Sequence, residues 1–113
     1  MKDDRVYLLH VRDACARIRA YTTDGRDAFV ADTRTQDAVI RNIEIIGEAV
    51  KNLSDTLRDA NPDVPWKRMA GMRDRMIHAY FGVDIDLVWE VVEAHIPALT
   101  GRVDALLEGL EGI

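Results

Sequence analysis

The chain has 113 residues, of which 48% are hydrophobic and 31% charged, and its formal net charge is −5. This length fits a single domain over residues 1–113, and the composition excludes a disordered or membrane-embedded chain. The acidic balance argues against a broadly basic surface for nucleic acid but allows a local cationic site. The lone cysteine, Cys15, excludes an internal disulfide, and the first residues lack the apolar stretch of a signal peptide, so we expect a cytoplasmic protein.

The first half of the chain predicts helices joined by short turns. Apolar residues at three-to-four spacing indicate an amphipathic helix over Asp4–Tyr21, which the turn-forming residues 22–25 would end. A short helix is expected over Arg26–Ala31. Asp32-Thr33 then offers an N-cap for a longer helix from Arg34 to the neighbourhood of Ala60. That helix carries a hydrophobic stripe formed by Val39, Ile43, Ile46, Val50, Leu53 and Leu57.

The second half predicts two further helices. Residues 61–65 contain two prolines, which disfavour helix at the preceding residue and end the long helix. One helix is expected from Trp66 to about Phe81. Another is expected from Asp84 onward, with a kink or restart at Pro97, which lacks an amide donor. No segment alternates polar and apolar residues over the length of a strand. The sequence therefore predicts an all-α, compact antiparallel bundle of four to five helices.

Arg73 occupies an unusual place on the helix predicted from Trp66. At about 100° per residue, Trp66, the nearby methionines and Tyr80 fall within one arc of about 160°, and Arg73 projects into its middle. A buried guanidinium cannot lose its charge, so it must meet a carboxylate, a partner chain or an anionic ligand. Two other readings stay open: Arg73 extends to water, or it pairs with an acid such as Glu48.

Three more polar residues lie within two turns of Arg73. Asp74 precedes His78 by four residues, a spacing that lets the carboxylate orient the imidazole. Tyr80 lies one heptad from Arg73 and so nearly on the same face, whereas His78 is about 140° away from Arg73. A site that uses both Arg73 and His78 needs a helix end, a long arginine reach or a second chain. His10 and His95 lie far from this group on separate helices and show no ligand spacing, so no metal site is expected.

Residues 65–84 as a whole closely resemble the signature of the HepT-like toxins, a branch of the HEPN superfamily. The core of that signature is an arginine, four residues, a histidine, one residue and a tyrosine, which match Arg73, His78 and Tyr80. The upstream block 41–49 and the downstream residues Val88-Trp89-Glu90 and Ile96-Pro97 also match in order and spacing. The resemblance covers essentially the whole chain.

This resemblance implies a homodimeric helical bundle that cleaves RNA without a metal or other cofactor. It also implies a cognate partner, a minimal nucleotidyltransferase antitoxin, which silences the toxin by AMPylating the motif tyrosine, here Tyr80. Arg73 and His78 would be the catalytic pair, and Glu48 in the upstream block would line the site. The family often has an amide after the arginine, whereas this chain has Asp74, which would either orient His78 or repel a phosphate.

The chemistry of RNA fits these residue types. The 2′-hydroxyl of RNA is the nucleophile, so histidine can act as the acid or base and arginine can stabilise the charge on the phosphorane. A dimer would place two copies of the motif helix side by side in a composite groove. The alternative, favoured by the acidic net charge and Asp74, is a non-catalytic helical module that binds a nucleotidyltransferase partner or a nucleotide.

Overall fold

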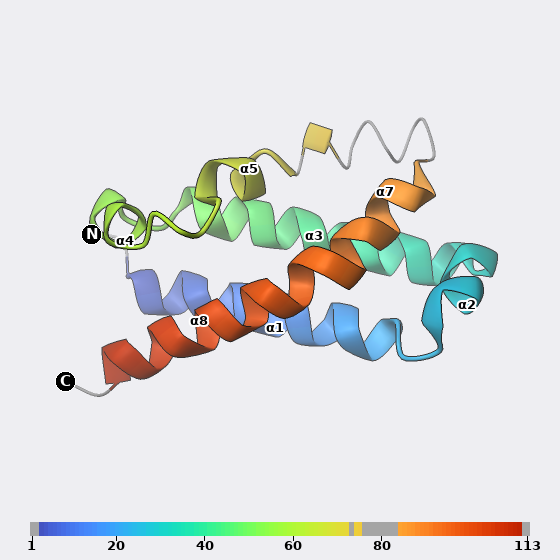
Figure 1. The fold of residues 1–113 in the computed structure, drawn as a ribbon, viewed down its shortest axis with the longest axis horizontal. Coiled ribbons are helices and arrows are strands. Elements are labelled where there is room, and N and C mark those ends of the chain that lie inside the picture. Colours follow the sequence, from blue (N-terminus) through green and yellow to red (C-terminus); the bar gives the residue numbers. More distant parts are fainter. Residues whose placement is uncertain (1–2, 73, 76–83, 112–113) are drawn as a thin grey trace.

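A computed structural model describes residues 3–72, 74–75 and 84–111, and all regular structure in these ranges is helical. The prediction of an all-α fold is confirmed. Figure 1 shows α1 and α3 lying side by side, with α8 crossing α1, α5 lying along α3, and α7 leading into the line of α8. The elements are α1 Asp4–Tyr21, α2 Gly25–Ala31, α3 Thr33–Lys51, α4 Asp55–Ala60, α5 Trp66–Ala70, α7 Ile85–Glu90, the π-helical turn η1 Val91–His95, and α8 Ile96–Glu111.

The core forms where α1, α3 and α8 meet. The apolar positions of α1 predicted from spacing are fully buried, and so are the first four members of the α3 stripe together with Leu53. Helix α8 adds residues at the same helical spacing: Ile96, Leu99, Val103 and Leu107. Cys15 lies inside this core, where burial raises the pKa of its thiol to about 11. Cys15 is therefore a packing residue and a neutral thiol at physiological pH.

Side-chain caps define the junction between α2 and α3. The Asp32 carboxylate accepts hydrogen bonds from the backbone N–H groups of Arg34 and Thr35 and from the Thr35 hydroxyl, and the last of these is the main reason that its pKa is lowered. The Gln36 amide is buried and donates to the carbonyl of Phe29 at 3.0 Å. Asp32 caps the helix as predicted, and Gln36 fastens α2 onto α3.

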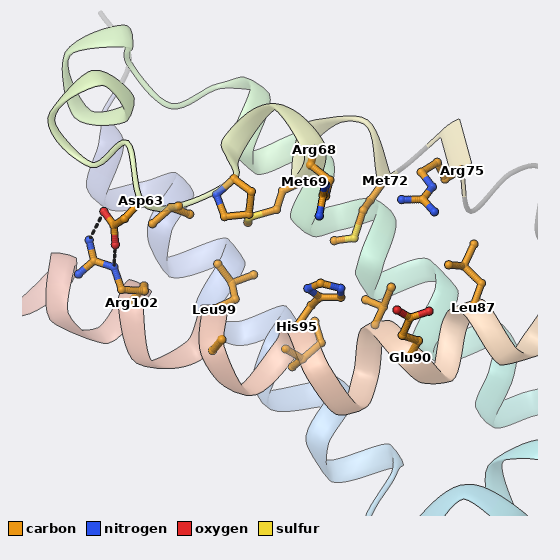
Figure 2. Close-up of a pocket in the computed structure, with 15 residues that line it drawn as sticks. Asp63, Arg68, Met69, Met72, Arg75, Leu87, Glu90, His95, Leu99 and Arg102 are labelled. Carbon is orange, nitrogen blue, oxygen red and sulfur yellow. Dashed lines mark hydrogen bonds and ion pairs between the residues drawn. The ribbon is translucent and has the colours of Figure 1, made fainter.

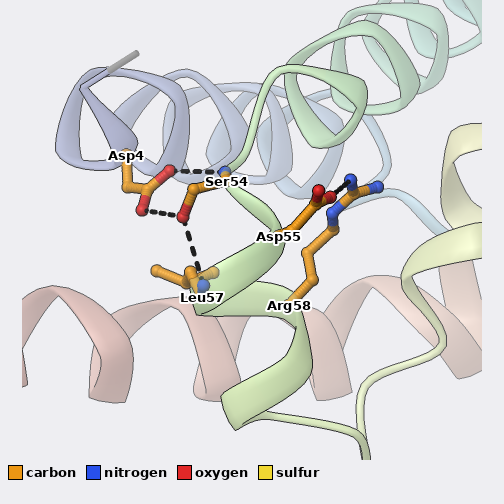
Figure 3. A network of polar contacts seen from close by, with 5 residues as sticks. All are labelled: Asp4, Ser54, Asp55, Leu57 and Arg58. Atoms are coloured by element: carbon orange, nitrogen blue, oxygen red, sulfur yellow. Dashed lines mark hydrogen bonds and ion pairs between the residues drawn. The ribbon is translucent and has the colours of Figure 1, made fainter. Parts of the chain in front are cut away.

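The prediction of one long helix from Arg34 to Ala60 is wrong, because the structure divides this segment into α3 and α4. Ser54 adopts an extended conformation between them and caps α4 by accepting from Leu57 N at 3.1 Å. Its own N–H and hydroxyl both donate to the Asp4 carboxylate, at 2.7 and 2.6 Å (Figure 3). This contact joins residues 50 positions apart, so helical periodicity alone could not reveal the break.

The predicted restart at Pro97 is confirmed as a π-helical turn. The N–H of Ile96 bonds to the carbonyl of Val91, five residues back, instead of the usual fourth. Pro97 follows immediately and has no N–H to donate to Glu93, so the wider turn also leaves space for its ring. In the part of the chain that the structure covers, none of the helices is both long and apolar enough to cross a bilayer.

We predict that Ser54→Ala lowers the free energy of unfolding by about 1–2 kcal/mol, because α4 loses its cap and Asp4 loses a donor. Thr56→Ala is the control: it also removes a hydroxyl from α4, but Thr56 is exposed, and a loss within about 0.5 kcal/mol is expected. Urea unfolding followed by circular dichroism measures both. Equal losses in the two variants would show that the contact with Asp4 contributes nothing.

Candidate functional site

The structure describes only part of the predicted catalytic group. Arg73, His78 and Tyr80 lie outside the described residues. Asp74 is exposed and belongs to a short helical stretch with Arg75, whose N–H donates to the carbonyl of Gly71 at 3.3 Å. The roles given to these residues, including the orientation of His78 by Asp74, therefore stay predictions.

The helix expected from Trp66 to about Phe81 is interrupted within the described residues. Helix α5 ends at Ala70, and Gly71 is its C-cap; the backbone is helical again at Met72 and at 74–75. Glycine favours such a break because it costs more to order in a helix than other residues. The predicted apolar arc is confirmed for Trp66, Met69 and Met72, which are 7%, 5% and 6% exposed.

Asn61 fixes α5 against α8. Its carbonyl accepts a hydrogen bond from the Trp66 indole N–H at 2.9 Å, so the first residue of α5 is anchored to the preceding loop. Its side-chain oxygen accepts from Arg102 Nη2 of α8 at 3.1 Å. Arg102 Nε lies 3.0 Å from Asp63 Oδ2 in an ion pair, and Arg102 Nη2 donates to Asp63 Oδ1 at 3.2 Å. These contacts determine where α5 begins and hold its first residue near α8.

A pocket of about 470 Å³ lies between this segment and the opposite wall formed by α7, η1 and α8 (Figure 2). Both walls contribute apolar side chains to its interior. On one wall Arg68, Met69, Met72 and Arg75 point across the gap toward Glu90, His95 and Leu99 on the other. The remaining lining residues are Asp63, Val64, Pro65, Leu87, Val91, Ile96, Ala98 and Arg102.

The pocket is cationic on the side of α5. Arg68 and Arg75 are exposed, and within the described ranges neither forms an ion pair. The charge of Arg102 is already paired with Asp63. An acidic chain thus presents two arginines beside an apolar interior. This arrangement can bind an anion that carries a flat apolar group.

The expectation that His95 is far from the motif stays a prediction, because Arg73, His78 and Tyr80 lie outside the described residues. His95 is exposed at the end of η1 and lines the same pocket as Met72 and Arg75, which lie one residue before and two residues after Arg73 in the chain. The pattern of either segment could not show this shared pocket, because the pocket depends on how α5 and Met72 lie opposite η1 and α8. Sequence reasoning also missed Arg68 and Arg75 as members of a pocket.

Glu48 lies in another pocket. It is exposed on α3 and, with Tyr7 and His10 of α1, lines a cavity of about 360 Å³. The rings of Tyr7 and His10 meet edge to face there, with centroids 5.9 Å apart. The two pockets share no lining residue. The role of Glu48 beside the motif stays a prediction. Among the residues that are described, no group of three histidine, cysteine or acidic side chains is placed to hold a metal ion.

The end of the motif segment is held by interactions around α7. Asp84 caps this helix by accepting from Leu87 N at 3.0 Å, and Asp86 in its first turn pairs with Arg26 of α2 at 2.7 Å, so both acids occupy the predicted helix start. Trp89 packs against Phe29 of α2 with ring centroids 5.3 Å apart. The described residues on both sides of the motif are therefore fixed to the bundle.

The fold and the pocket define a small helical protein with a partly cationic, partly apolar binding site, and comparison with known proteins identifies its family. The model of the HepT-like family, described as ribonuclease HepT-like, matches residues 11–106. The chain belongs to this family, and the resemblance noted in its sequence is confirmed. No solved structure matches the chain at a significant level.

Several proteins are similar over nearly all of the chain. "Gamma-glutamylcyclotransferase and putative RNase MJ0434" of Methanocaldococcus jannaschii is 46% identical over 97% of this chain and 50% of its own length. "Probable ribonuclease HepT" of Thermococcus cleftensis is 44% identical over 88% of this chain and 92% of its own length. "Putative RNase TTE0752" of Caldanaerobacter subterraneus is 41% identical over 96% of this chain and 97% of its own length. The chain thus spans half of the first relative and nearly all of the other two.

We predict that Asn61→Ala lowers the free energy of unfolding by about 1–3 kcal/mol, because the bonds from Arg102 and to the carbonyl of Leu57 are both lost. Asn52→Ala is the control, since the Asn52 amide makes one exposed bond, to the carbonyl of Glu48 within the same turn. Chemical unfolding compares the two variants. Asn61 would not anchor α5 to α8 if its variant were no less stable than the control.

Proposed function

We propose that this chain is a metal-independent endoribonuclease and the toxin component of a two-gene toxin–antitoxin system. The observation that carries the proposal is the Arg73, His78 and Tyr80 motif in a chain of the ribonuclease HepT-like family. The names of three similar proteins, which call them probable or putative ribonucleases, support the same activity. The pocket supports an RNA substrate, because Arg68 and Arg75 line it and Arg75 lies two residues from Arg73 in the chain.

The proposed reaction uses the 2′-hydroxyl of RNA. Its oxygen attacks the adjacent phosphorus, the bond to the 5′-oxygen breaks, and the products are a 2′,3′-cyclic phosphate and a 5′-hydroxyl. His78 takes the proton from the 2′-hydroxyl or gives one to the leaving oxygen, a role that suits an imidazole, which ordinarily titrates near pH ~6.5. Arg73 stabilises the charge that grows on the phosphorane oxygens. No step in this sequence requires a metal.

We further propose that two copies of the chain form the active enzyme. Arg73 and His78 point about 140° apart on an ideal helix, so one helix does not direct both at a single phosphate. A homodimer with the motif helices side by side would supply two histidines, one to act as base and one as acid. Asp74, which is exposed, would then orient His78.

We predict that Arg73→Ala and His78→Ala each reduce RNA cleavage by at least about 10²-fold, since each removes charge stabilisation or proton transfer in the transition state. Cleavage of end-labelled RNA by the purified chain in excess chelator is the measurement. His10→Ala, which removes an exposed imidazole from the other pocket, is the control and should cleave like the parent.

Cleavage by His78→Ala at the parental rate would contradict the assignment. A parent chain that is folded and unmodified but leaves RNA intact would instead favour the non-catalytic binding module. Growth arrest on induction without any partner, abolished by the same two substitutions, would connect the activity to a toxin.

The proposed partner is a minimal nucleotidyltransferase that modifies Tyr80. The phenol oxygen attacks the α-phosphorus of ATP, pyrophosphate leaves, and the phenol proton passes to solvent. The bulk and negative charge of the attached adenylate would exclude RNA from the site.

We predict that, after incubation with the cognate nucleotidyltransferase and ATP, intact-mass spectrometry shows one or more added adenylates on the parent and none on Tyr80→Phe. Tyr21→Phe is the matched control, because Tyr21 is an exposed tyrosine at the end of α1, and it should be modified like the parent. An adenylate on Tyr80→Phe would show that another residue is the acceptor.

A further inference from the structure

We propose that the pocket between residues 63–75 and the α7–α8 wall binds one unpaired nucleotide of the RNA, with the base on its apolar floor and a flanking phosphate on Arg68 and Arg75. This inference rests on the proposed ribonuclease function and adds to it the part of the molecule that holds the substrate.

The floor of the pocket suits a nucleobase. Met69, Met72 and Leu99 line it and are each at least nine-tenths buried, so the contact surface is fixed by the core and does not have to form on binding. The volume of about 470 Å³ lies within the range of small-ligand sites. Thioether groups make favourable contacts with aromatic rings, and every base presents a flat π-face.

The rim of the pocket on the α5 side suits a phosphate. Arg68 and Arg75 reach into it and make no ion pair in the described part of the chain. Arginine binds phosphate through paired N–H donors, so two arginines that lie beside an apolar surface without an ion pair leave their donors open to an anion. A peptide partner would need an acidic and an aromatic side chain in this same arrangement. Every RNA nucleotide already carries a phosphate and an aromatic base.

The opposite wall determines which way the nucleotide lies. Glu90 is exposed there beside His95, so it would repel a phosphate and the backbone must follow the α5 side. A carboxylate accepts hydrogen bonds from exocyclic amines, as it does from cytosine N4. Uracil has no exocyclic amine. The pocket should therefore prefer adenine, cytosine or guanine to uracil.

The position of the pocket connects it to cleavage. Met72 immediately precedes Arg73, and Arg75 follows two residues later. A nucleotide held between these residues and α8 therefore contacts side chains one and two residues from Arg73 in the chain. The pocket would thus select the site of cleavage without taking part in the chemistry.

The test measures binding of a short fluorescein-labelled single-stranded RNA by full chains carrying His78→Ala, which keeps the RNA intact. In one variant Ala98→Trp fills the pocket from an exposed lining position. In the other, Arg68→Gln and Arg75→Gln remove the rim charges. The matched controls are Ala16→Trp and the pair Arg19→Gln and Arg34→Gln, which change exposed residues that line neither pocket. Circular dichroism checks that every variant is folded.

We expect Ala98→Trp to weaken binding about tenfold or more, since stacking of a single base is lost. The rim variant should lower the slope of log affinity against log salt by about 0.7, because the two arginines hold one phosphate and each single-strand phosphate contributes about 0.7. Both controls should bind like the parent. An oligoadenylate should bind more tightly than an oligouridylate, and Glu90→Gln should reduce that difference.

Pocket variants that bind like their controls overturn the inference, even if the parent cleaves RNA, and leave the proposed function standing. Pocket-dependent binding by a parent chain that never cleaves RNA supports the binding site and overturns the nuclease. A folded parent that neither binds nor cleaves RNA overturns both.

Discussion

The rest of the structure depends on the packing of α3 against α1. Val39, Ile43, Ile46 and Val50 project from one face of α3 and are completely buried, and Leu8, Val11 and Ile18 of α1 cover them. Because α3 also contacts α2 and α5, its position determines where the segment leading to the motif begins. The candidate site is thus held by the least exposed part of the molecule, although its own charged residues lie at the surface.

The positions of the individual charges matter more for binding an anion than the net charge of the chain. A total of −5 suggests a poor surface for nucleic acid, yet the acids are spread over helix starts and surface ion pairs. Asp32 and Asp84 cap helices, Asp63 pairs with Arg102, and Asp86 pairs with Arg26. Arg68 and Arg75 are left without such partners among the described residues. A cationic site therefore exists on an acidic protein, as the composition allowed.

Features that depend on local rules could be predicted from the sequence. The bounds of α1, the buried stripe of α3, the cap at Asp32 and the interruption before Pro97 all follow from periodicity, capping and the missing proline amide. The family resemblance could also be recognised from the sequence, because Arg73, His78 and Tyr80 keep the order and spacing of a known signature.

Features that depend on contacts between distant residues could not be predicted. The break at Ser54 requires the carboxylate of Asp4, 50 residues away. The pocket requires α5 and Met72 to lie opposite His95, and the bonds of Asn61 to Trp66 and Arg102 hold the start of α5 near α8. Spacing within one helix carries no information on how separate helices face each other, so the motif was found and the pocket was missed.

In the proposed reaction the nucleophile is the 2′-hydroxyl of the RNA itself, and one measurement tests this directly. The purified chain is incubated in excess chelator with an RNA and with the same RNA methylated on every 2′-oxygen, and the product ends are identified by mass spectrometry. Cleavage of the unmodified RNA alone, leaving a 2′,3′-cyclic phosphate and a 5′-hydroxyl, is the predicted result. Cleavage of the methylated RNA, or activity only after a metal is added, would contradict the proposed reaction.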